Sequence, residues 1–139
     1  MADIAIIGTG SWGTALASLL GNNNHKVTLW SAFEEEINML KEFHEHKDKL
    51  PGVILKGSVS YTTDISEALS NRDVIVLAVP SPFIRSTAHK MAEFIKDSQI
   101  IVNVAKGIEE KELQSFLATL KKIDQAMADG RLSEESSDL

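Results

Sequence analysis

Short apolar runs rich in β-branched residues alternate along the chain with longer stretches that place apolar residues at helical spacing. The runs predict parallel strands, and the longer stretches predict the helices that cover them. Strands are expected at residues 4–7, 26–30, 59–61, 74–79 and 99–105, and helices at about 11–20, 34–48, 64–69 and 81–95. This alternation is typical of an α/β fold built on a doubly wound parallel sheet.

Individual residues of this pattern also predict how two of the strands are buried and where two of the helices begin. The runs at 74–79 and 99–105 have few polar positions, so both strands are expected to be buried on both faces. Thr63 or Asp64 can cap the third helix. Ser81 can cap the fourth helix, with Pro82 at its first helical position.

The turn after the first predicted strand carries the strongest functional signal. Residues 8–13 read Gly-Thr-Gly-Ser-Trp-Gly and lead into a helix rich in Ala and Leu. In this context Gly-x-Gly-x-x-Gly is typical of a Rossmann-type dinucleotide-binding domain. We expect Gly8 to permit a tight turn, Gly10 to let the backbone approach a pyrophosphate, and Gly13 to let the helix pack closely on the strand. The start of the helix near Ser11 would then face the phosphates.

Other polar segments follow predicted strands in the same way. They are residues 30–31, 80–81 and 106–107. Ligands of open α/β sheets bind outside the carboxyl ends of the strands, so we expect Ser31, Pro80 and Lys106 to share a site with the glycine turn. The ammonium of Lys106 could there meet a phosphate or carbonyl oxygen.

Composition narrows the classes of function. The chain has 139 residues, a formal net charge of −6 and no cysteine. Without a basic cluster, nucleic acids and anionic membrane surfaces are not expected partners. The lack of cysteine excludes disulfides and thiolate chemistry. No apolar run is long enough to span a bilayer, and the sequence begins directly in a predicted strand. We therefore expect a cytoplasmic protein without membrane insertion.

A resemblance to a known family rests on several motifs in order. They are Gly-Ser-Trp-Gly-Thr-Ala-Leu-Ala at 10–17, Leu-Pro-Gly-Val at 50–53, Ala-Val-Pro-Ser at 78–81 and Ala-Lys-Gly-Ile-Glu at 105–109. Together they resemble the N-terminal half of bacterial NAD(P)-dependent glycerol-3-phosphate dehydrogenase, over residues 1 to about 112. The resemblance implies reversible hydride transfer between dihydroxyacetone phosphate with NAD(P)H and sn-glycerol 3-phosphate, which supplies phospholipid synthesis.

The resemblance also implies roles for particular residues. Ser11 and Trp12 would contact the cofactor, and Lys106 would reach both the nicotinamide end and the phosphate-bearing substrate. The general acid/base lysine of the family belongs to a later domain, so no catalytic residue is assigned within this chain. The fold is accordingly expected to be truncated relative to the family.

The choice between NAD and NADP stays open. The second predicted strand ends in Trp30-Ser31-Ala32-Phe33, without the acidic residue typical of NAD selectivity or an arginine suited to a 2′-phosphate. The carboxylates of residues 34–36 come slightly late and are expected to form the first turn of the next helix. His44 and His46 are expected on a solvated charged face rather than at a metal site, because i, i+2 residues point to different sides of a helix.

The C-terminal segment suggests a different organisation. Residues 1–109 form the predicted dinucleotide-binding domain, and residues 110–139 form a helical tail that departs from the family pattern. An apolar stripe over residues 113–127 could pair in a homodimer or could simply cap the sheet.

Two other functions of the chain also stay open. One is a dehydrogenase for another substrate, which the narrow motifs disfavour, and the other is a non-catalytic nucleotide-binding or interaction module.

Overall fold

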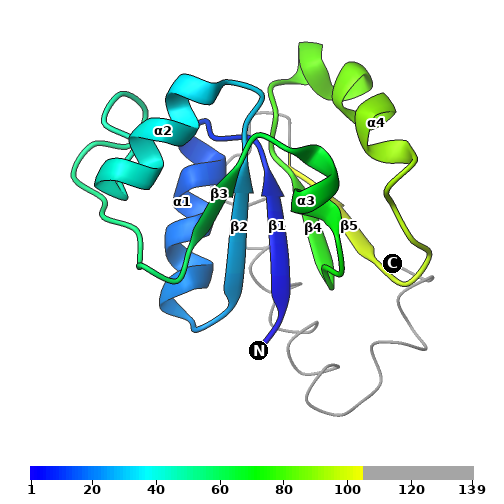
Figure 1. The fold of residues 1–139 in the computed structure, drawn as a ribbon, viewed down its shortest axis with the longest axis horizontal. Helices are drawn as coiled ribbons and strands as arrows, with labels where there is room; N and C mark the ends of the chain where they lie inside the picture. The colour runs from blue at the N-terminus through cyan, green and yellow to red at the C-terminus, as the bar shows by residue number, and fades with distance from the viewer. Residues whose placement is uncertain (105–139) are drawn as a thin grey trace.

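A parallel five-stranded sheet lies at the centre of the computed structural model, which describes residues 1–104 (Figure 1). Its strands are β1 (Asp3–Ile7), β2 (Lys26–Trp30), β3 (Ser60–Thr62), β4 (Val74–Leu77) and β5 (Ile100–Asn103). They lie in the order β3-β2-β1-β4-β5, and all neighbouring pairs are parallel. Chain order therefore reverses direction at β1, and the α/β class predicted from the sequence is confirmed.

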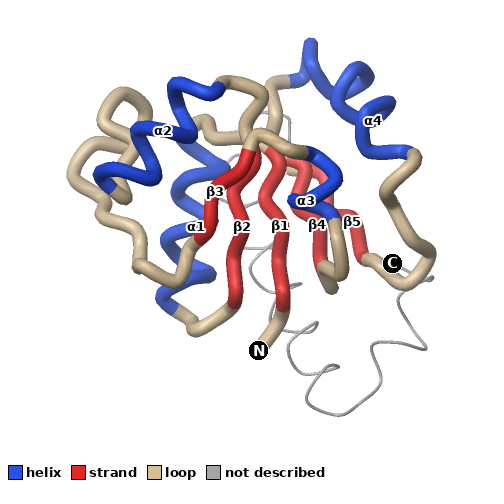
Figure 2. Tube along the Cα trace, viewed as in Figure 1, coloured by secondary structure: helices blue, strands red, loops and turns tan. Residues whose placement is uncertain are grey.

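Helices cover both faces of this sheet (Figure 2). They are α1 (Ser11–Asn22), α2 (Glu34–Phe43), α3 (Ile65–Leu69) and α4 (Ile84–Ala92), and a short 3₁₀ helix, η1 (Ser81–Phe83), precedes α4. Buried residues of α1 and α2 pack on one face, while residues of α3 and α4 pack on the other. The sheet is thus doubly wound, as predicted.

Alternate residues of the central strands feed the two halves of the core. Ile4 and Ile6 of β1 pack with α1 and α2, whereas Ala5 and Ile7 pack with α3 and α4. Every residue of β4 is also buried. This two-sided burial explains why these strands read as continuous apolar runs rather than as alternating ones.

The structure corrects the expected burial of the last strand. Within the described residues β5 pairs only with β4, so it lies at the edge of the sheet. Ile101 is 44% exposed, and Asn103 is exposed as well. The apolar composition of this run reflects one-sided packing, and the prediction of burial on both faces was wrong.

Several helix boundaries also differ from the predictions; α4, for example, ends at Ala92 rather than at residue 95, and two other differences bear on the site. α2 ends at Phe43 rather than near residue 48, because His44 takes a left-handed backbone conformation with φ of 54°. Its N–H donates to the carbonyl of Leu40 at 2.8 Å, which closes the helix. Residues 44–59 then form a loop without helix or strand, called here the 44–59 loop.

The second boundary concerns the segment after β4. Residues 81–83 form a 3₁₀ turn, closed by the Phe83 N–H donating to the Pro80 carbonyl at 2.8 Å. α4 therefore begins at Ile84, and Ser81 is not its N-cap. The predicted cap of α3 is confirmed at Asp64, whose carboxylate accepts from the N–H groups of Ser66 and Glu67.

None of the helices within residues 1–104 combines the length and apolar character needed to cross a bilayer. The predicted helical stripe at 113–127, and the homodimer suggested from it, lie outside the described residues.

Candidate cofactor site

A cleft of about 150 Å³ lies at the carboxyl ends of β1, β2 and β4. Residues that follow these strands form most of its wall, and residues of α2, the loop after α2, η1 and α4 complete it. The lining comprises residues 8–10, 30–33, 79–80, Glu36, Lys49, Phe83, Ser86, Thr87 and Lys90. The cleft stands where the strand order reverses, which is the usual ligand position in open α/β sheets.

Gly8 and Gly13 shape the turn that enters the cleft. Gly8 has φ of +126°, and a Cβ on it would lie 2.7 Å from the carbonyl oxygen of Ala78. A Cβ on Gly13 would lie 2.1 Å from the carbonyl oxygen of Gly8. A side chain fits at neither position, so the structural roles predicted for these two glycines, a tight turn and close helix packing, are confirmed.

Gly10 differs from both in its surroundings. It is the N-cap of α1, with extended backbone, and a Cβ added to it would meet no heavy atom of the described residues within 4 Å. The first N–H groups of α1 have no partner within the helix, and its N-terminus carries the positive end of the helix dipole. The space in front of Gly10 can therefore accept an anionic group.

The predicted site residues divide into three groups. Gly8, Gly10, Ser31 and Pro80 all line the cleft, as the convergence of strand ends predicts. Ser11, Trp12 and Gly13 lie in the first turn of α1 and are not among the lining residues. Trp12 is half-buried. Lys106 lies outside the described residues.

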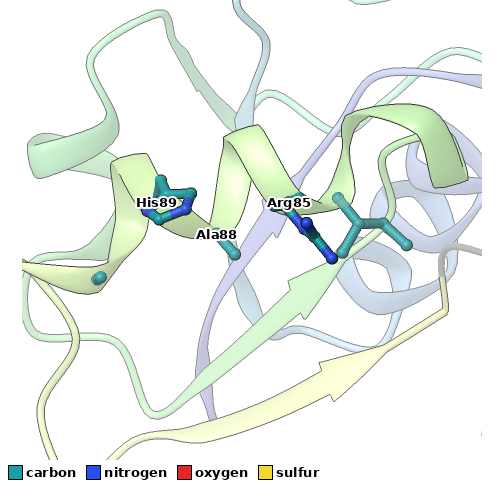
Figure 3. A pocket seen from close by; sticks show the side chains of 5 residues that line it. Arg85, Ala88 and His89 are labelled. Carbon is teal, nitrogen blue, oxygen red and sulfur yellow. The ribbon is translucent and has the colours of Figure 1, made fainter.

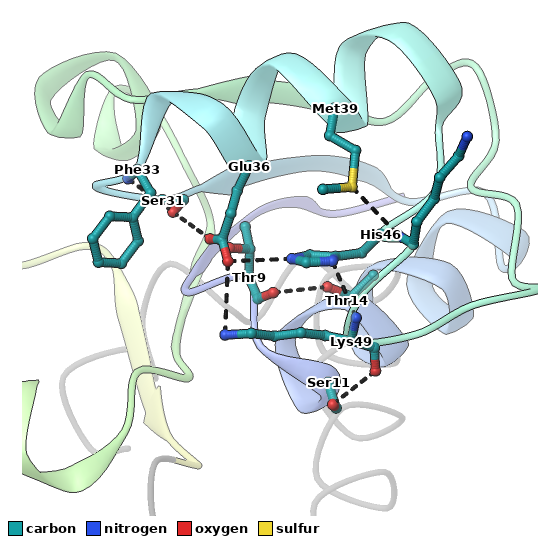
Figure 4. Close-up of polar contacts among 10 residues, drawn as sticks. Thr9, Ser11, Thr14, Ser31, Phe33, Glu36, Met39, His46 and Lys49 are labelled. Atoms are coloured by element: carbon teal, nitrogen blue, oxygen red, sulfur yellow. Dashed lines mark hydrogen bonds and ion pairs between the residues drawn. The ribbon is translucent and has the colours of Figure 1, made fainter.

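The Glu36 carboxylate lies at the wall of the cleft and joins several segments (Figure 4). Its Oε2 accepts from the hydroxyl of Thr9, in the glycine turn, and from the hydroxyl of Ser31 at 2.9 Å, just after β2. Its Oε1 lies 3.3 Å from Nε2 of His46 and 3.7 Å from the ammonium of Lys49, both in the 44–59 loop. Both oxygens of the Glu36 carboxylate therefore have hydrogen-bond or ion-pair partners.

These contacts set the ionisation of Glu36. Burial of the side chain by itself would raise its pKa, but the hydrogen bonds from Thr9, Ser31 and His46 and the charge of Lys49 outweigh it. The net pKa of Glu36 lies below its ordinary value of 4.5. The cleft thus contains a carboxylate that is ionised at neutral pH and partly compensated by Lys49.

Two further contacts fix the backbone of the 44–59 loop beside the glycine turn. The Ser11 hydroxyl donates to the Lys49 carbonyl at 2.8 Å. The N–H of Lys49 donates to Nδ1 of His46 at 3.2 Å (Figure 4). Because Nδ1 accepts here, Nε2 is the ring nitrogen that carries a proton toward Glu36. Ser11, which does not line the cleft, thus contacts the backbone of the loop that supplies Lys49.

The sequence did not predict the cluster of polar side chains around Glu36, for two reasons. Glu34, Glu35 and Glu36 do form the first turn of α2, as predicted, but Glu36 also faces the cleft. His46 is only 1% exposed, so its predicted place on a solvated face was wrong. That error followed from extending α2 through residue 48. Within residues 1–104 no group of three or more His, Cys, Asp or Glu residues could hold a metal ion.

A second hollow lies along α4 (Figure 3). Its described lining residues all belong to that helix: Ile84, Arg85, Ala88, His89 and Ala92. Arg85 and His89 are four residues apart and share one helix face. No lining residue from another element converges on them within the described residues, so we assign no site here.

Comparison with known proteins shows the family to which this chain is similar. A model of the family described as NAD-dependent glycerol-3-phosphate dehydrogenase N-terminus matches residues 3–129. The match extends past residue 109, into the segment expected to depart from the family. An NAD(P)+ glycerol-3-phosphate dehydrogenase of Agathobacter rectalis is 62% identical over 116 residues, which are 84% of this chain and 34% of that protein. The corresponding enzyme of Fusobacterium nucleatum is 47% identical over 116 residues, 84% of this chain and 35% of that protein.

Solved structures show the same relationship at the level of the fold. A glycerol-3-phosphate dehydrogenase of Coxiella burnetii superposes with a TM-score of 0.73 at 28% identity, covering 79% of this chain and 34% of that one. The yeast enzyme superposes with a TM-score of 0.70 at 21% identity, over 78% of this chain and 34% of that one, and supports the fold alone. The chain spans about a third of the length of the curated relatives. By the extent of the family match, this chain belongs to the family of NAD-dependent glycerol-3-phosphate dehydrogenase N-terminal domains.

Proposed function

We propose that this chain is the cofactor-binding part of an NAD(P)-dependent sn-glycerol-3-phosphate dehydrogenase. The reaction is the reversible reduction of dihydroxyacetone phosphate to sn-glycerol 3-phosphate, with NAD(P)H oxidised to NAD(P)+. Support comes from the family match and from the names of the close relatives, which are glycerol-3-phosphate dehydrogenases of the NAD(P)+ type. Supply of phospholipid synthesis and a cytoplasmic location are further parts of the proposal and rest on the sequence resemblance.

The observation that carries the proposal is the contrast among the three glycines of the turn. Gly8 and Gly13 are required by the protein's own backbone, whereas Gly10 faces open space at the start of α1. A ligand that approaches the backbone closely would account for glycine at position 10. A pyrophosphate suits this position because the helix N-terminus offers free N–H groups and a favourable dipole.

The remaining lining residues fit the rest of a dinucleotide. Ser31, just after β2, and Glu36, in the first turn of α2, lie where such folds recognise the adenosine ribose. Phe33 and Phe83 line the cleft with rings that are 66% and 55% exposed, which offers apolar surface for a planar base. The bound nicotinamide supplies the hydride-transfer chemistry, and the residues of this cleft bind and orient the molecule.

Ser11, Trp12, Pro80 and Lys106 complete the proposed cofactor site. Ser11 and Trp12 stand in the first turn of α1, next to the glycine turn, and Pro80 lines the cleft. Lys106 is proposed to contact both the nicotinamide end and the substrate phosphate, on the strength of the Ala-Lys-Gly-Ile-Glu motif alone. No residue of this chain is proposed as the general acid/base.

Fluorescence titration of the chain with NADH, followed by competition with ADP, tests the proposal. ADP carries the adenosine and pyrophosphate that the described cleft should hold, so it should displace NADH competitively. Nicotinamide mononucleotide, which lacks the adenosine, should compete far more weakly. Failure of the folded chain to bind NADH and NADPH would overturn the proposed function.

A further inference from the structure

The choice between NAD and NADP can be related to two side chains of the cleft, on the basis of the proposed function. The two cofactors differ only at the 2′ position of the adenosine ribose, a hydroxyl in NAD and a phosphate in NADP. Dinucleotide folds usually read this position at the end of the second strand, with an acidic residue for the hydroxyl or a cation for the phosphate. In this chain both kinds of residue line the cleft beside that strand end. Glu36 of α2 accepts from the Ser31 hydroxyl just after β2, and the Lys49 ammonium lies 3.7 Å from Glu36.

Glu36 is held more firmly than a free surface carboxylate. Its side chain is 18% exposed, and Thr9, Ser31 and His46 donate to its oxygens. These partners come from three different segments, so the carboxylate cannot turn away from the cleft without breaking contacts between them. Glu36 is therefore a fixed negative charge at the wall of the cleft nearest the end of β2.

Lys49 is the movable member of the pair. Its backbone is anchored by the Ser11 hydroxyl and by the ring of His46. Its side chain is 49% exposed, and its ammonium lies 3.7 Å from Glu36, a looser contact than the hydrogen bonds of the other partners. A lysine ammonium has three donors on a flexible stem, so it can serve a second anion without a change in the loop.

We propose that the Glu36–Lys49 pair sets the preference of this chain between NAD and NADP. With NAD the pair stays closed, and the Glu36 charge is compensated. With NADP the Lys49 ammonium turns to the 2′-phosphate and screens it from Glu36. The carboxylate disfavours the phosphate and the ammonium favours it, so the balance between the two side chains gives the selectivity.

Direct titration with NADH and with NADPH measures this balance as a ratio of dissociation constants. Lys49→Met should weaken NADPH binding by roughly tenfold or more, because it removes an attraction and leaves Glu36 uncompensated, while NADH binding changes little. Glu36→Gln should shift the ratio toward NADPH. Lys49→Gln provides a second, polar replacement with the same expected direction. Thermal unfolding of each variant confirms that the protein titrated is folded.

Two lysines serve as matched controls. Lys47 belongs to the same loop, but its ammonium lies over the ring of Phe43 and it does not line the cleft, so Lys47→Met should leave the ratio unchanged. Lys90 lines the cleft from α4, so Lys90→Met tests a cation at another wall. A selective loss of NADPH binding in Lys90→Met rather than in Lys49→Met would contradict the proposal.

The double variant, which combines Glu36→Gln with Lys49→Met, distinguishes a pair from two independent residues. Loss of Lys49 should weaken NADPH binding less in the Glu36→Gln background than in the native one, because no carboxylate is then exposed. Equal losses in both backgrounds, or an unchanged ratio in every variant that binds NADH, would overturn the role of the pair while leaving the proposed function intact. Lack of any dinucleotide binding by the native chain would instead overturn both.

Discussion

The carbonyl oxygen of Gly8 lies 2.1 Å from the position that a Cβ on Gly13 would occupy. This distance is far below any normal contact between a carbon and an oxygen atom. The turn before α1 and the first turn of the helix therefore pack backbone against backbone. The contact brings the helix N-terminus against the end of β1, which places it at the cleft.

Gly13→Ala should destabilise the fold because the added methyl group collides with backbone rather than with a flexible side chain. We expect a loss of about 1–3 kcal/mol in the free energy of unfolding, or more if the helix cannot shift. Urea unfolding followed by circular dichroism measures it. Gly57→Ala is the control, since a Cβ there meets no described atom within 4 Å. Equal stability of the two variants would show that the Gly8–Gly13 packing is not required.

Asp64→Ala should weaken the start of α3. The Asp64 carboxylate accepts from the Ser66 N–H at 2.9 Å, and the same oxygen accepts from the Ser66 hydroxyl at 2.6 Å. Loss of this N-cap lowers stability because the N–H groups of Ser66 and Glu67 lose their side-chain acceptor. Asp64→Asn keeps an acceptor and should recover most of the loss in the same urea titration. An alanine variant as stable as the native chain would show that this cap contributes nothing.

Glu36 should make stability depend on pH. Because its pKa in the folded chain lies below the ordinary 4.5, its contribution is fully present above that value and is lost as the pH falls through the folded pKa. We expect the difference in thermal midpoint between the native chain and Glu36→Gln to be constant near neutral pH. It should narrow once the pH drops below about 4.5. A difference that stays constant down to acid pH would contradict the ionised network.

The centre of the sheet could be predicted from the sequence because β1 and β4 are buried on both faces. The runs around Ile4–Ile7 and Val74–Leu77 contain no polar position that would favour an exposed face. Such continuous apolar runs are typical of parallel strands that helices cover on both faces. The glycine turn was predictable for a similar reason. Each of its three glycines is expected for a different physical reason. For Gly8 and Gly13 the structure shows that reason, because a Cβ at either position would collide with backbone atoms.

The 44–59 loop could not be predicted because its conformation depends on contacts between distant residues. His44 takes a left-handed conformation that only glycine and asparagine signal well in a sequence, so α2 looked longer than it is. Once the helix stops there, His46 turns inward to Glu36 and Lys49 reaches the cleft. Local spacing carries no sign of these contacts, which join residues ten and more positions apart.

The isolated chain should bind cofactor without measurable turnover of dihydroxyacetone phosphate. It spans about a third of its curated relatives, and the resemblance assigns the general acid/base to a later part of the family's chain. Positioned acid/base groups contribute roughly 10²–10⁴-fold to rates. Loss of the near-ultraviolet absorbance of reduced nicotinamide, as NADH is oxidised, provides the assay. Sustained turnover at rates usual for dehydrogenases would show that this chain contains its own acid/base group.

Calorimetric titration of Gly10→Val with NADH tests the central claim most directly. The extended backbone of Gly10 and the open space around it allow a valine, so the variant should unfold at nearly the native temperature. Its side chain would occupy the space in front of the α1 N-terminus, where we place the pyrophosphate. The account predicts a folded variant whose affinity for NADH falls below detection. Native affinity in a folded Gly10→Val variant would contradict the assignment of this cleft to a dinucleotide.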